Sequence, residues 1–270
     1  MDWNTPSTAD QAQYDPADVF AAGLALHHIA NTAYPIAHLA TMRPYRVPRS
    51  DVQSAAPPAW QSIDRLGLYV HIPFCEARCG FCEYTVVDPS TNADTEDLYF
   101  DLLHREFELY SKALGAPNKT LIGFDIGGGT PSVASVANIA RVVEDAWRCF
   151  HLPDQVAISI ETTPKIAAHQ PEKVQAYYDL GIRRISMGVQ TINARLLQEA
   201  GRTGTSVAYN QRATGHIRQA GFQRFNVDVM YGFARQSLSS LEATLQHVIS
   251  LQPDYITLYR TRYKGTRVAA

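Results

Sequence analysis

The chain of 270 residues is predicted to be an α/β protein built around a parallel sheet of six strands. From residue 66 onward, apolar strand-like runs alternate with helix-like segments. Strand–helix repetition at this spacing specifies parallel strands joined by right-handed crossovers. The polar motifs described below all fall at the carboxyl ends of expected strands, where such sheets bind ligands. Periodicity does not separate an open doubly wound sheet from a partial barrel, so both remain compatible with these observations.

Expected strands and helices alternate along the chain. The strands are expected at Leu68–Ile72, Leu121–Ile126, Val156–Glu161, Arg184–Gly188, Phe225–Tyr231 and Tyr255–Tyr259. The helices between them are expected at Thr95–Leu114, Ser135–Cys149, Pro171–Leu180, Asn193–Ala200 together with Ser206–Ala220, and Leu238–Leu251. Each strand is a short apolar run, as expected for the buried strands of a parallel sheet.

Residues 1–60 differ from the rest of the sequence, and we interpret them as an N-terminal arm that packs on a main domain, residues 61–270. Within the arm, Ala17–Ile29 is compatible with one amphipathic helix opened by Pro16. A helix is not expected to persist further, because proline lacks a backbone donor and clashes with the preceding turn. The prolines that follow are Pro35, Pro44, Pro48, Pro57 and Pro58.

Composition argues against several classes of protein. The 24 basic and 26 acidic residues give a formal net charge of −2, which does not favour a general nucleic-acid or anionic-membrane surface. A run of about 18 apolar residues, as a membrane-spanning helix needs, does not occur in the sequence. The first residues lack the basic start and apolar middle of a signal peptide. We therefore expect a cytoplasmic protein.

Three of the four cysteines, Cys75, Cys79 and Cys82, lie within eight residues of one another, and Cys149 is far away. This distribution is a poor disulfide framework for a chain of this size. Clustered thiols in a chain that is not secreted are better interpreted as metal ligands. Cys149 lies near the end of an expected helix, where a free cysteine usually serves as a small buried apolar residue.

The spacing Cys-x3-Cys-x2-Cys places three thiols on one short loop after the first expected strand. Three thiolates can hold three corners of a cubane iron–sulfur cluster and leave one iron open to a small molecule. A structural zinc site is the alternative. Zinc would require a fourth cysteine or histidine nearby, but Glu83, Tyr84 and Thr85 follow the loop, and His71 sits within the strand. We therefore favour the cluster.

A glycine run and a carboxylate follow the next two strands. Gly127, Gly128 and Gly129 come directly after the second strand, and consecutive glycines let a ligand approach exposed backbone N–H groups. A tight turn explains such a run equally well when it is considered alone. Glu161 ends the third strand, where its carboxylate can accept hydrogen bonds from an ammonium group or from ribose hydroxyls. An ordinary surface glutamate is the alternative at that position.

The fourth and fifth strands bring further polar groups to the same rim. Gln190 offers both a donor and an acceptor, and Arg202, twelve positions later, could bind a carboxylate through two parallel hydrogen bonds. Arg183 and Arg184 lie nearby as competing candidates. Asp228 stands among apolar residues of the fifth strand, and a buried carboxylate needs partners that ribose hydroxyls would supply.

Together these motifs resemble the radical S-adenosylmethionine (SAM) superfamily, and within it the branch of the oxygen-independent coproporphyrinogen III oxidase. The resemblance covers residues 66 to about 262. It implies a partial (β/α)6 barrel. It rests on Leu68-Tyr-Val-His-Ile-Pro-Phe-Cys75 with the three-cysteine loop, Gly127-Gly-Gly-Thr-Pro131, Ser159-Ile-Glu161, Gly188-Val-Gln190 with Arg202, and Asp228-Val-Met-Tyr-Gly232.

The resemblance implies that the open iron binds the amino and carboxylate groups of SAM. An electron from the 4Fe–4S cluster would then cleave SAM to methionine and a 5′-deoxyadenosyl radical. A small-molecule substrate and an electron donor such as flavodoxin or ferredoxin are implied as partners, and the residues themselves indicate no general base. The implied SAM-binding residues, for one or two SAM molecules, are Tyr69, Phe81, Gly128, Gly129, Thr130, Glu161, Gln190, Arg202, Asp228 and, through its backbone, Arg262.

The sequence also departs from the oxidase. Tyr84 stands where the oxidase has a further cysteine, Ala234 replaces a usual proline, and the ending Tyr259–Thr266 is unlike the oxidase. These departures favour a subgroup of the same branch, the C-methyltransferases and cyclopropane-forming enzymes of natural-product biosynthesis, which use a second SAM as methyl donor. Relatives continue into a C-terminal domain, so we expect that such a domain is missing here or that a partner supplies this lid.

Three alternatives to methyl transfer remain open. The first is porphyrin chemistry, either oxidative decarboxylation of coproporphyrinogen or anaerobic opening of heme. The second is a heme chaperone that uses the same fold without turnover. The third is a binding protein stabilised by zinc.

Overall fold

The computed structural model describes residues 63–82, 84, 86–91, 94–115, 119–202 and 205–262. The expected N-terminal arm, including Ala17–Ile29, lies outside these residues, so the arm and its boundary at residue 60 stay predictions. Residues 263–266, the last part of the ending Tyr259–Thr266, also lie outside the described residues. No helix within the described ranges is long and apolar enough to cross a membrane.

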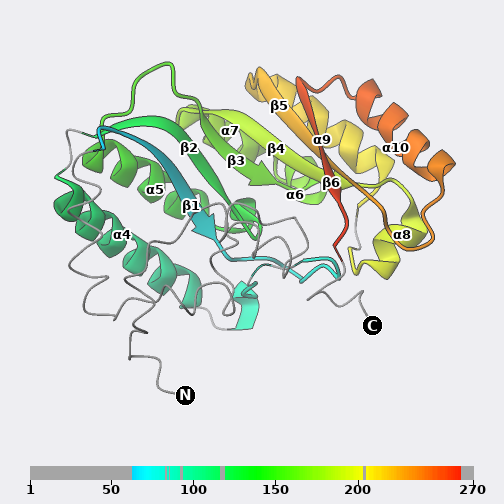
Figure 1. The fold of residues 1–270 in the computed structure, drawn as a ribbon, viewed down its shortest axis with the longest axis horizontal. Coiled ribbons are helices and arrows are strands. Elements are labelled where there is room, and N and C mark those ends of the chain that lie inside the picture. The colour runs from blue at the N-terminus through cyan, green and yellow to red at the C-terminus, as the bar shows by residue number, and fades with distance from the viewer. Residues whose placement is uncertain are drawn as a thin grey trace, which may run out of the picture. The chain divides into compact units, whose positions relative to one another are not determined.

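Six parallel strands form one sheet in the order β1-β2-β3-β4-β5-β6 (Figure 1). A doubly wound sheet would reverse its strand order at a switch point, whereas here every strand pairs with its neighbour in sequence. The sequential order confirms the partial (β/α)6 barrel. The strands are β1 (Arg65–Ile72), β2 (Thr120–Gly128), β3 (Ile158–Thr162), β4 (Ile182–Gln190), β5 (Arg224–Tyr231) and β6 (Tyr255–Arg260).

Helices connect successive strands and lie along the outer side of the curved sheet (Figure 1). One helix was not expected from the sequence: Pro164–His169 forms a separate turn-and-a-half because Thr163 caps its first turn and Pro171 starts the next helix. The α-helices are α4 (Thr95–Leu114), α5 (Val136–Cys149), α6 (Pro164–His169), α7 (Pro171–Asp179), α8 (Ala194–Glu199), α9 (Val207–Ala220) and α10 (Leu238–Ser250), with short 3-10 helices η4 (Pro89–Thr91) and η5 (Pro131–Val133).

Side-chain caps begin five of these helices. In each, a Ser, Thr or Asn oxygen accepts a hydrogen bond from the backbone N–H three residues later. One such cap stabilises a helix by roughly 1 kcal/mol. Most of them follow the carboxyl end of a strand, so they fix the loops of that rim as well as the helices. The capping residues are Ser135, Thr163, Asn193, Ser206 and Ser237.

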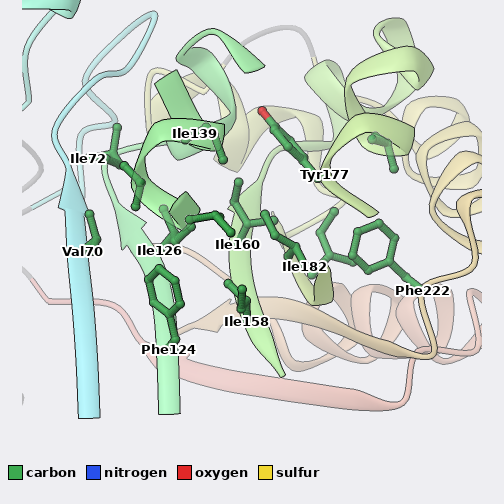
Figure 2. Close-up of a cluster of buried hydrophobic side chains, with 14 of the residues drawn as sticks. Val70, Ile72, Phe124, Ile126, Ile139, Ile158, Ile160, Tyr177, Ile182 and Phe222 are labelled. Atoms are coloured by element: carbon green, nitrogen blue, oxygen red, sulfur yellow. The ribbon is translucent and has the colours of Figure 1, made fainter. Parts of the chain in front are cut away.

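Alternate strand residues point to opposite sides of the sheet, and one side is mostly apolar. Figure 2 shows these side chains gathered between the strands and the helices. Phe124, Ile160 and Val227, from three different strands, each have 0% of their surface exposed. Cys149 is buried in the same cluster, which confirms its expected role in the core.

The other side of the sheet, which we call the open face, carries polar side chains at the intervening positions. Asp125, Glu161, Ser186 and Asp228 lie there, on β2, β3, β4 and β5. Three carboxylates on one face of a sheet would be unusual in a purely structural core, because burying a charge is costly unless it is paired. This face leads to the rim where the predicted site lies.

Candidate functional site

The cysteine loop begins where β1 ends and is held at several backbone points. Cys75 N–H donates to the carbonyl of Val87 (3.1 Å), and Val87 N–H donates back to that of Pro73 (2.9 Å). Further along, Gly80 N–H donates to the carbonyl of Ala200, after α8, at 2.6 Å. The loop is therefore attached to both β1 and the segment after β4, although most of it has no regular secondary structure.

The three thiols of this loop are free and partly exposed. Cys75 Sγ lies 3.3 Å from Thr130 Oγ1, at hydrogen-bond distance, and Arg202 Nη1 lies 3.8 Å from Cys79 Sγ. Burial raises the pKa of the Cys75 thiol, the Thr130 hydrogen bond lowers it, and the neighbouring Cys79 and Cys82 raise it further. The electrostatic effect of Cys79 and Cys82 on Cys75 places the three thiols in the same region of the loop.

The donor set fits a cluster better than a single metal ion. Within the described residues, no three His, Cys, Asp or Glu side chains are grouped closely enough to hold one ion. A cubane cluster takes one thiolate at each of three irons, so it suits three thiols that do not converge on one point. Cys75, Cys79 and Cys82 would hold such a cluster, and hydrogen bonds to their sulfurs would tune its reduction potential.

The glycine run lies directly against the cysteine loop. Gly129 N–H donates to the carbonyl of Ile72 (2.7 Å), and Thr130 N–H donates to that of Phe74 (2.8 Å). A Cβ on Gly129 would sit 2.8 Å from the Phe74 carbonyl oxygen, which is backbone that cannot move aside. Gly128 has φ +120°, a conformation that L side chains rarely adopt. Glycine is therefore required here by close approach to the loop.

Glu161 reaches this run from β3. Its Oε2 accepts a hydrogen bond from Gly128 N–H at 3.3 Å. Burial, followed by the nearby charge of Asp228, raises the pKa of Glu161 to about 7; the Gly128 hydrogen bond lowers it and Asp125 adds a smaller increase. A carboxyl group whose pKa lies near 7 can lose its proton when a cationic ligand binds beside it.

Asp228 is the centre of a hydrogen-bond network on the open face. Its Oδ2 accepts from Ser186 Oγ (3.1 Å), and its Oδ1 accepts from Asn226 Nδ2 (2.8 Å). Asn226 Nδ2 also donates to Ser186 Oγ at 2.7 Å, and Thr257 Oγ1 donates to Asn226 Oδ1 at 2.9 Å. Burial raises the pKa of Asp228, while these hydrogen bonds and the charge of Arg202 lower it.

Gln190 and Arg202 meet at a bulge in β4. The register between β4 and β5 shifts between Gly188 and Gln190, and Gln190 has φ +67°. Backbone strain of this kind collects at functional sites, and a bulge re-aims the side chain that follows it. Gln190 Oε1 is buried without a hydrogen-bond partner in the described structure. Arg202 Nη2 donates to the Gly188 carbonyl at 2.5 Å, so it is fixed beside Cys79.

Aromatic side chains border the site. Tyr69 is 56% exposed, although it lies within β1. The Phe81 ring lies 6.0 Å from that of Phe233, nearly perpendicular to it. The pKa of Tyr259 is raised to about 12 by burial, with Asp228 and Glu161 adding to the effect. The structure thus places Tyr259 near the two carboxylates.

The structure brings most of the predicted residues together and adds several. The loop cysteines, the glycine run, Glu161, Asp228 and Arg202 are connected by the contacts above. Arg262 lies two residues beyond β6, next to Thr261, whose N–H donates to the Tyr231 carbonyl at 2.7 Å, and its backbone role stays a prediction. Sequence reasoning missed residues that share the open face by alternation along a strand or follow its end: Ser186, Asn226, Thr257, Tyr259 and Phe233.

Comparison with known proteins identifies the family. Residues 69–248 match the family described as the radical SAM superfamily. The chain belongs to the radical SAM superfamily. Its cofactors are accordingly a 4Fe–4S cluster and SAM. The three cysteines and the rim residues around them remain our assignment within this superfamily.

Several members of the superfamily resemble this chain more specifically. It is 30% identical over 196 residues to the heme chaperone HemW of Haemophilus influenzae, covering 72% of this chain and 50% of that protein. It is 31% identical over 206 residues to the oxygen-independent coproporphyrinogen III oxidase of Salmonella typhimurium, covering 76% and 44%. The structure of coproporphyrinogen III oxidase (HemN) from Escherichia coli aligns with a TM-score of 0.71 and 27% identity, covering 80% of this chain and 49% of that one.

These similarities correct the expected subgroup and show how much of its relatives' length the chain spans. The C-methyltransferase subgroup favoured by Tyr84 and the Tyr259–Thr266 ending is not supported, because the similar curated proteins named above are a heme chaperone and a porphyrinogen oxidase. A solved radical SAM methyltransferase, TsrM, aligns at only 14% identity, which shows the shared fold alone. The chain also spans about half the length of the curated relatives it matches.

Proposed function

We propose that this chain is a porphyrin-directed radical SAM protein. It binds SAM at a cluster on Cys75, Cys79 and Cys82 and carries, or acts on, a heme-type tetrapyrrole. The observation that carries this proposal is that two kinds of relative, each similar over about three quarters of the chain, are both named for heme or its precursor.

Tyr84 favours the carrier over the oxidase. It stands at the position where the resemblance to the oxidase implies a further cysteine, and it is 54% exposed beside the cysteine loop. Its ring centroid lies 6.1 Å from that of His71 on β1. An exposed aromatic ring at this point offers an apolar surface to a flat ligand, whereas a thiol would offer a metal ligand. We therefore place the chain nearer to the heme chaperones.

The residues of the rim have distinct parts in this proposal. The glycine run and Glu161 bind the methionine part of SAM, Glu161 accepting from its ammonium group after losing a proton. Gln190 and Asp228 bind polar groups of SAM, such as ribose hydroxyls, because Gln190 Oε1 has no partner in the described structure and Asp228 is preorganised by its network. Arg202 positions the Cys79 sulfur.

The proposal is tested on protein purified and reconstituted without oxygen. Titration with hemin should produce a saturable shift of the heme absorption band at one equivalent per chain. With SAM and a reductant, coproporphyrinogen should remain unchanged if the chain is a carrier, and should become protoporphyrinogen if it is an oxidase. Unchanged coproporphyrinogen together with hemin binding, or conversion of coproporphyrinogen, supports a porphyrin-directed protein.

The methyl-transfer alternative gives a different product pattern. A methyltransferase that uses two SAM molecules should release 5′-deoxyadenosine and S-adenosylhomocysteine together and place a methyl label in its acceptor. If the protein binds no hemin, leaves coproporphyrinogen unchanged and labels a non-porphyrin acceptor, the proposal is wrong. The Cys82→Ala variant serves as the control for products that do not depend on the cluster.

A further inference from the structure

A second cavity lies at the amino ends of the strands, at the rim opposite the cysteine loop. Its volume is about 460 Å³, and it is lined by the first residues of β1, β2 and β5, by Arg184 of β4 and by the segment that precedes β3. Sites for small molecules usually measure about 300–1,000 Å³. The cavity is therefore large enough for a small ligand, and none of the motifs of the SAM site reaches it.

Three arginines line this cavity, and no aspartate or glutamate does. Arg184 Nη1 lies 3.6 Å from Asp125 Oδ1, a long ion pair between two half-exposed side chains. Within the described ranges, the side chains of Arg65 and Arg224 have neither a hydrogen bond nor an ion pair. The lining thus carries three positive charges against one carboxylate that reaches it from outside.

The strand register places two of these charges side by side. Arg184 of β4 pairs directly with Arg224 of β5. Like charges directly opposite each other on neighbouring strands are destabilising. Thr120 and Gln155 line the same cavity and add a hydroxyl and an amide that can donate hydrogen bonds. A lining that places two like charges side by side, adds neutral donors and contains no carboxylate of its own is explained by an anion that binds there.

We propose that this cavity is a binding site for a phosphoryl group, either as free pyrophosphate or as the diphosphate of a nucleotide. The guanidinium fork matches phosphate oxygens in pairs, and such charge-assisted hydrogen bonds are among the stronger ones in proteins. Arginines supplied by three separate strands can surround an anion with several oxygens and more than one negative charge. The proposal does not depend on the porphyrin-directed function, because the two rims use different residues.

The binding test uses the full chain and isothermal titration. Sodium pyrophosphate should bind with one site per chain in a buffer whose ionic strength is matched with sodium chloride. ADP is titrated in parallel: tighter binding than pyrophosphate identifies a nucleotide site, and equal or weaker binding identifies the free anion. If neither compound binds above the chloride background, or if only the dicarboxylate malonate binds, the proposal is overturned.

Variants show whether the anion occupies this cavity. Arg224→Gln and Arg65→Gln should each weaken binding about tenfold or more, as expected when a hydrogen-bonding group facing a charged ligand is removed. Arg212→Gln, on the exposed surface of α9, is the matched control and should bind like the parent. Unchanged affinity in both cavity variants would overturn the proposal.

Thermal unfolding without ligand separates a binding role from a structural one. Because Arg224 faces Arg184, the Arg224→Gln variant should unfold at the same temperature as the parent or a higher one. Pyrophosphate should raise the unfolding temperature of the parent and of Arg212→Gln more than that of Arg224→Gln. A large loss of stability in Arg224→Gln without ligand would mean that the arginine is structural and would contradict the proposal.

Discussion

Two neighbouring residues of β2 show how differently the two faces of the sheet are built. Phe124 points to the helices and has 0% of its surface exposed, whereas the Asp125 side chain is 50% exposed on the open face. The same alternation continues on β3 with Ile160 and Glu161. One face therefore maximises apolar burial, while the other gathers carboxylates that do not help the chain to fold.

This difference teaches where function lies in the barrel. A face selected for stability would not place Asp228 where its charge raises the pKa of Glu161. Their hydrogen-bond partners also come from other strands, so the arrangement depends on the sequential strand order of the sheet. Each prediction below tests whether a residue follows the rule of its own face, beginning with the largest expected effect.

The four cysteines also divide between the predicted site and the core. Cys82→Ala, in the loop at the rim, should abolish the roughly four irons per chain expected after anaerobic reconstitution. Cys149→Ala, in the helix-covered core, should leave the iron content unchanged and cost only some stability. Iron and sulfide analysis checks both variants. Stoichiometric zinc with no iron in the parent protein would contradict the cluster assignment.

The helix-covered face should be highly sensitive to loss of volume. Phe124→Ala is expected to lower the free energy of unfolding by about 3–5 kcal/mol, because it removes a fully buried ring and leaves a cavity. Denaturant unfolding of the cofactor-free protein measures this loss. A loss below about 1 kcal/mol would mean that this face is not packed as the structure shows.

Glu161 should make the open face sensitive to pH. Its folded-state pKa of about 7 lies above the ordinary glutamate value of 4.5, so ionisation is less favourable in the folded protein. Below about pH 4.5 the Glu161 carboxyl group is protonated in both the folded and the unfolded protein, so it does not lower stability. As the pH rises from there to about 7, the free energy of unfolding decreases, by up to about 3 kcal/mol in all.

The Glu161→Gln variant isolates this effect, because it keeps the shape of the side chain and removes the charge. Relative to the variant, the cofactor-free parent should become less stable between pH 5 and pH 8. Unfolding free energies at several pH values provide the measurement. Parallel pH profiles for the two proteins would show that the pKa of Glu161 is not raised.

Residues of the open face should affect SAM binding more than stability. Asp228→Ala and Gln190→Ala should each weaken SAM binding by roughly 1–3 kcal/mol, about 5- to 150-fold in Kd, while iron content stays the same. Calorimetry on the reconstituted protein measures the affinity, and Arg212→Gln provides a surface control. If both variants bind SAM as tightly as the parent, the assignment of this face to SAM is wrong.

The sequence predicts the helices, the strands and the motif residues at the carboxyl ends of the strands well, because all of them depend on local signals. Apolar runs and helix caps give four of the five crossovers nearly as observed, and the short spacing of the cysteines places them in one loop. The separate helix Pro164–His169 was missed, because six residues are too few for a periodic pattern. Strand order could not be read from periodicity and needed either the structure or the resemblance.

Contacts between strands were beyond prediction from the sequence. Ser186, Asn226 and Thr257 surround Asp228 because three strands align in register, and their separation in sequence gives no motif. The bulge that re-aims Gln190 is equally invisible in the sequence. The three arginines of the second cavity have the same origin, since only the parallel register gathers Arg65, Arg184 and Arg224 at one rim.

The smallest effect is expected for Asp125, and it connects the two rims. Asp125→Ala removes a half-exposed carboxylate whose ion pair with Arg184 is 3.6 Å long, and such pairs contribute only about 0–1 kcal/mol. The variant should therefore unfold almost like the parent, in contrast to Phe124→Ala one position earlier. Loss of the carboxylate should also leave Arg184 free for an anion, so pyrophosphate should bind more tightly to Asp125→Ala than to the parent. A strong loss of stability would show that the open face contributes to the core after all, and weaker pyrophosphate binding would show that Asp125 supports the arginine cavity instead of competing with its ligand.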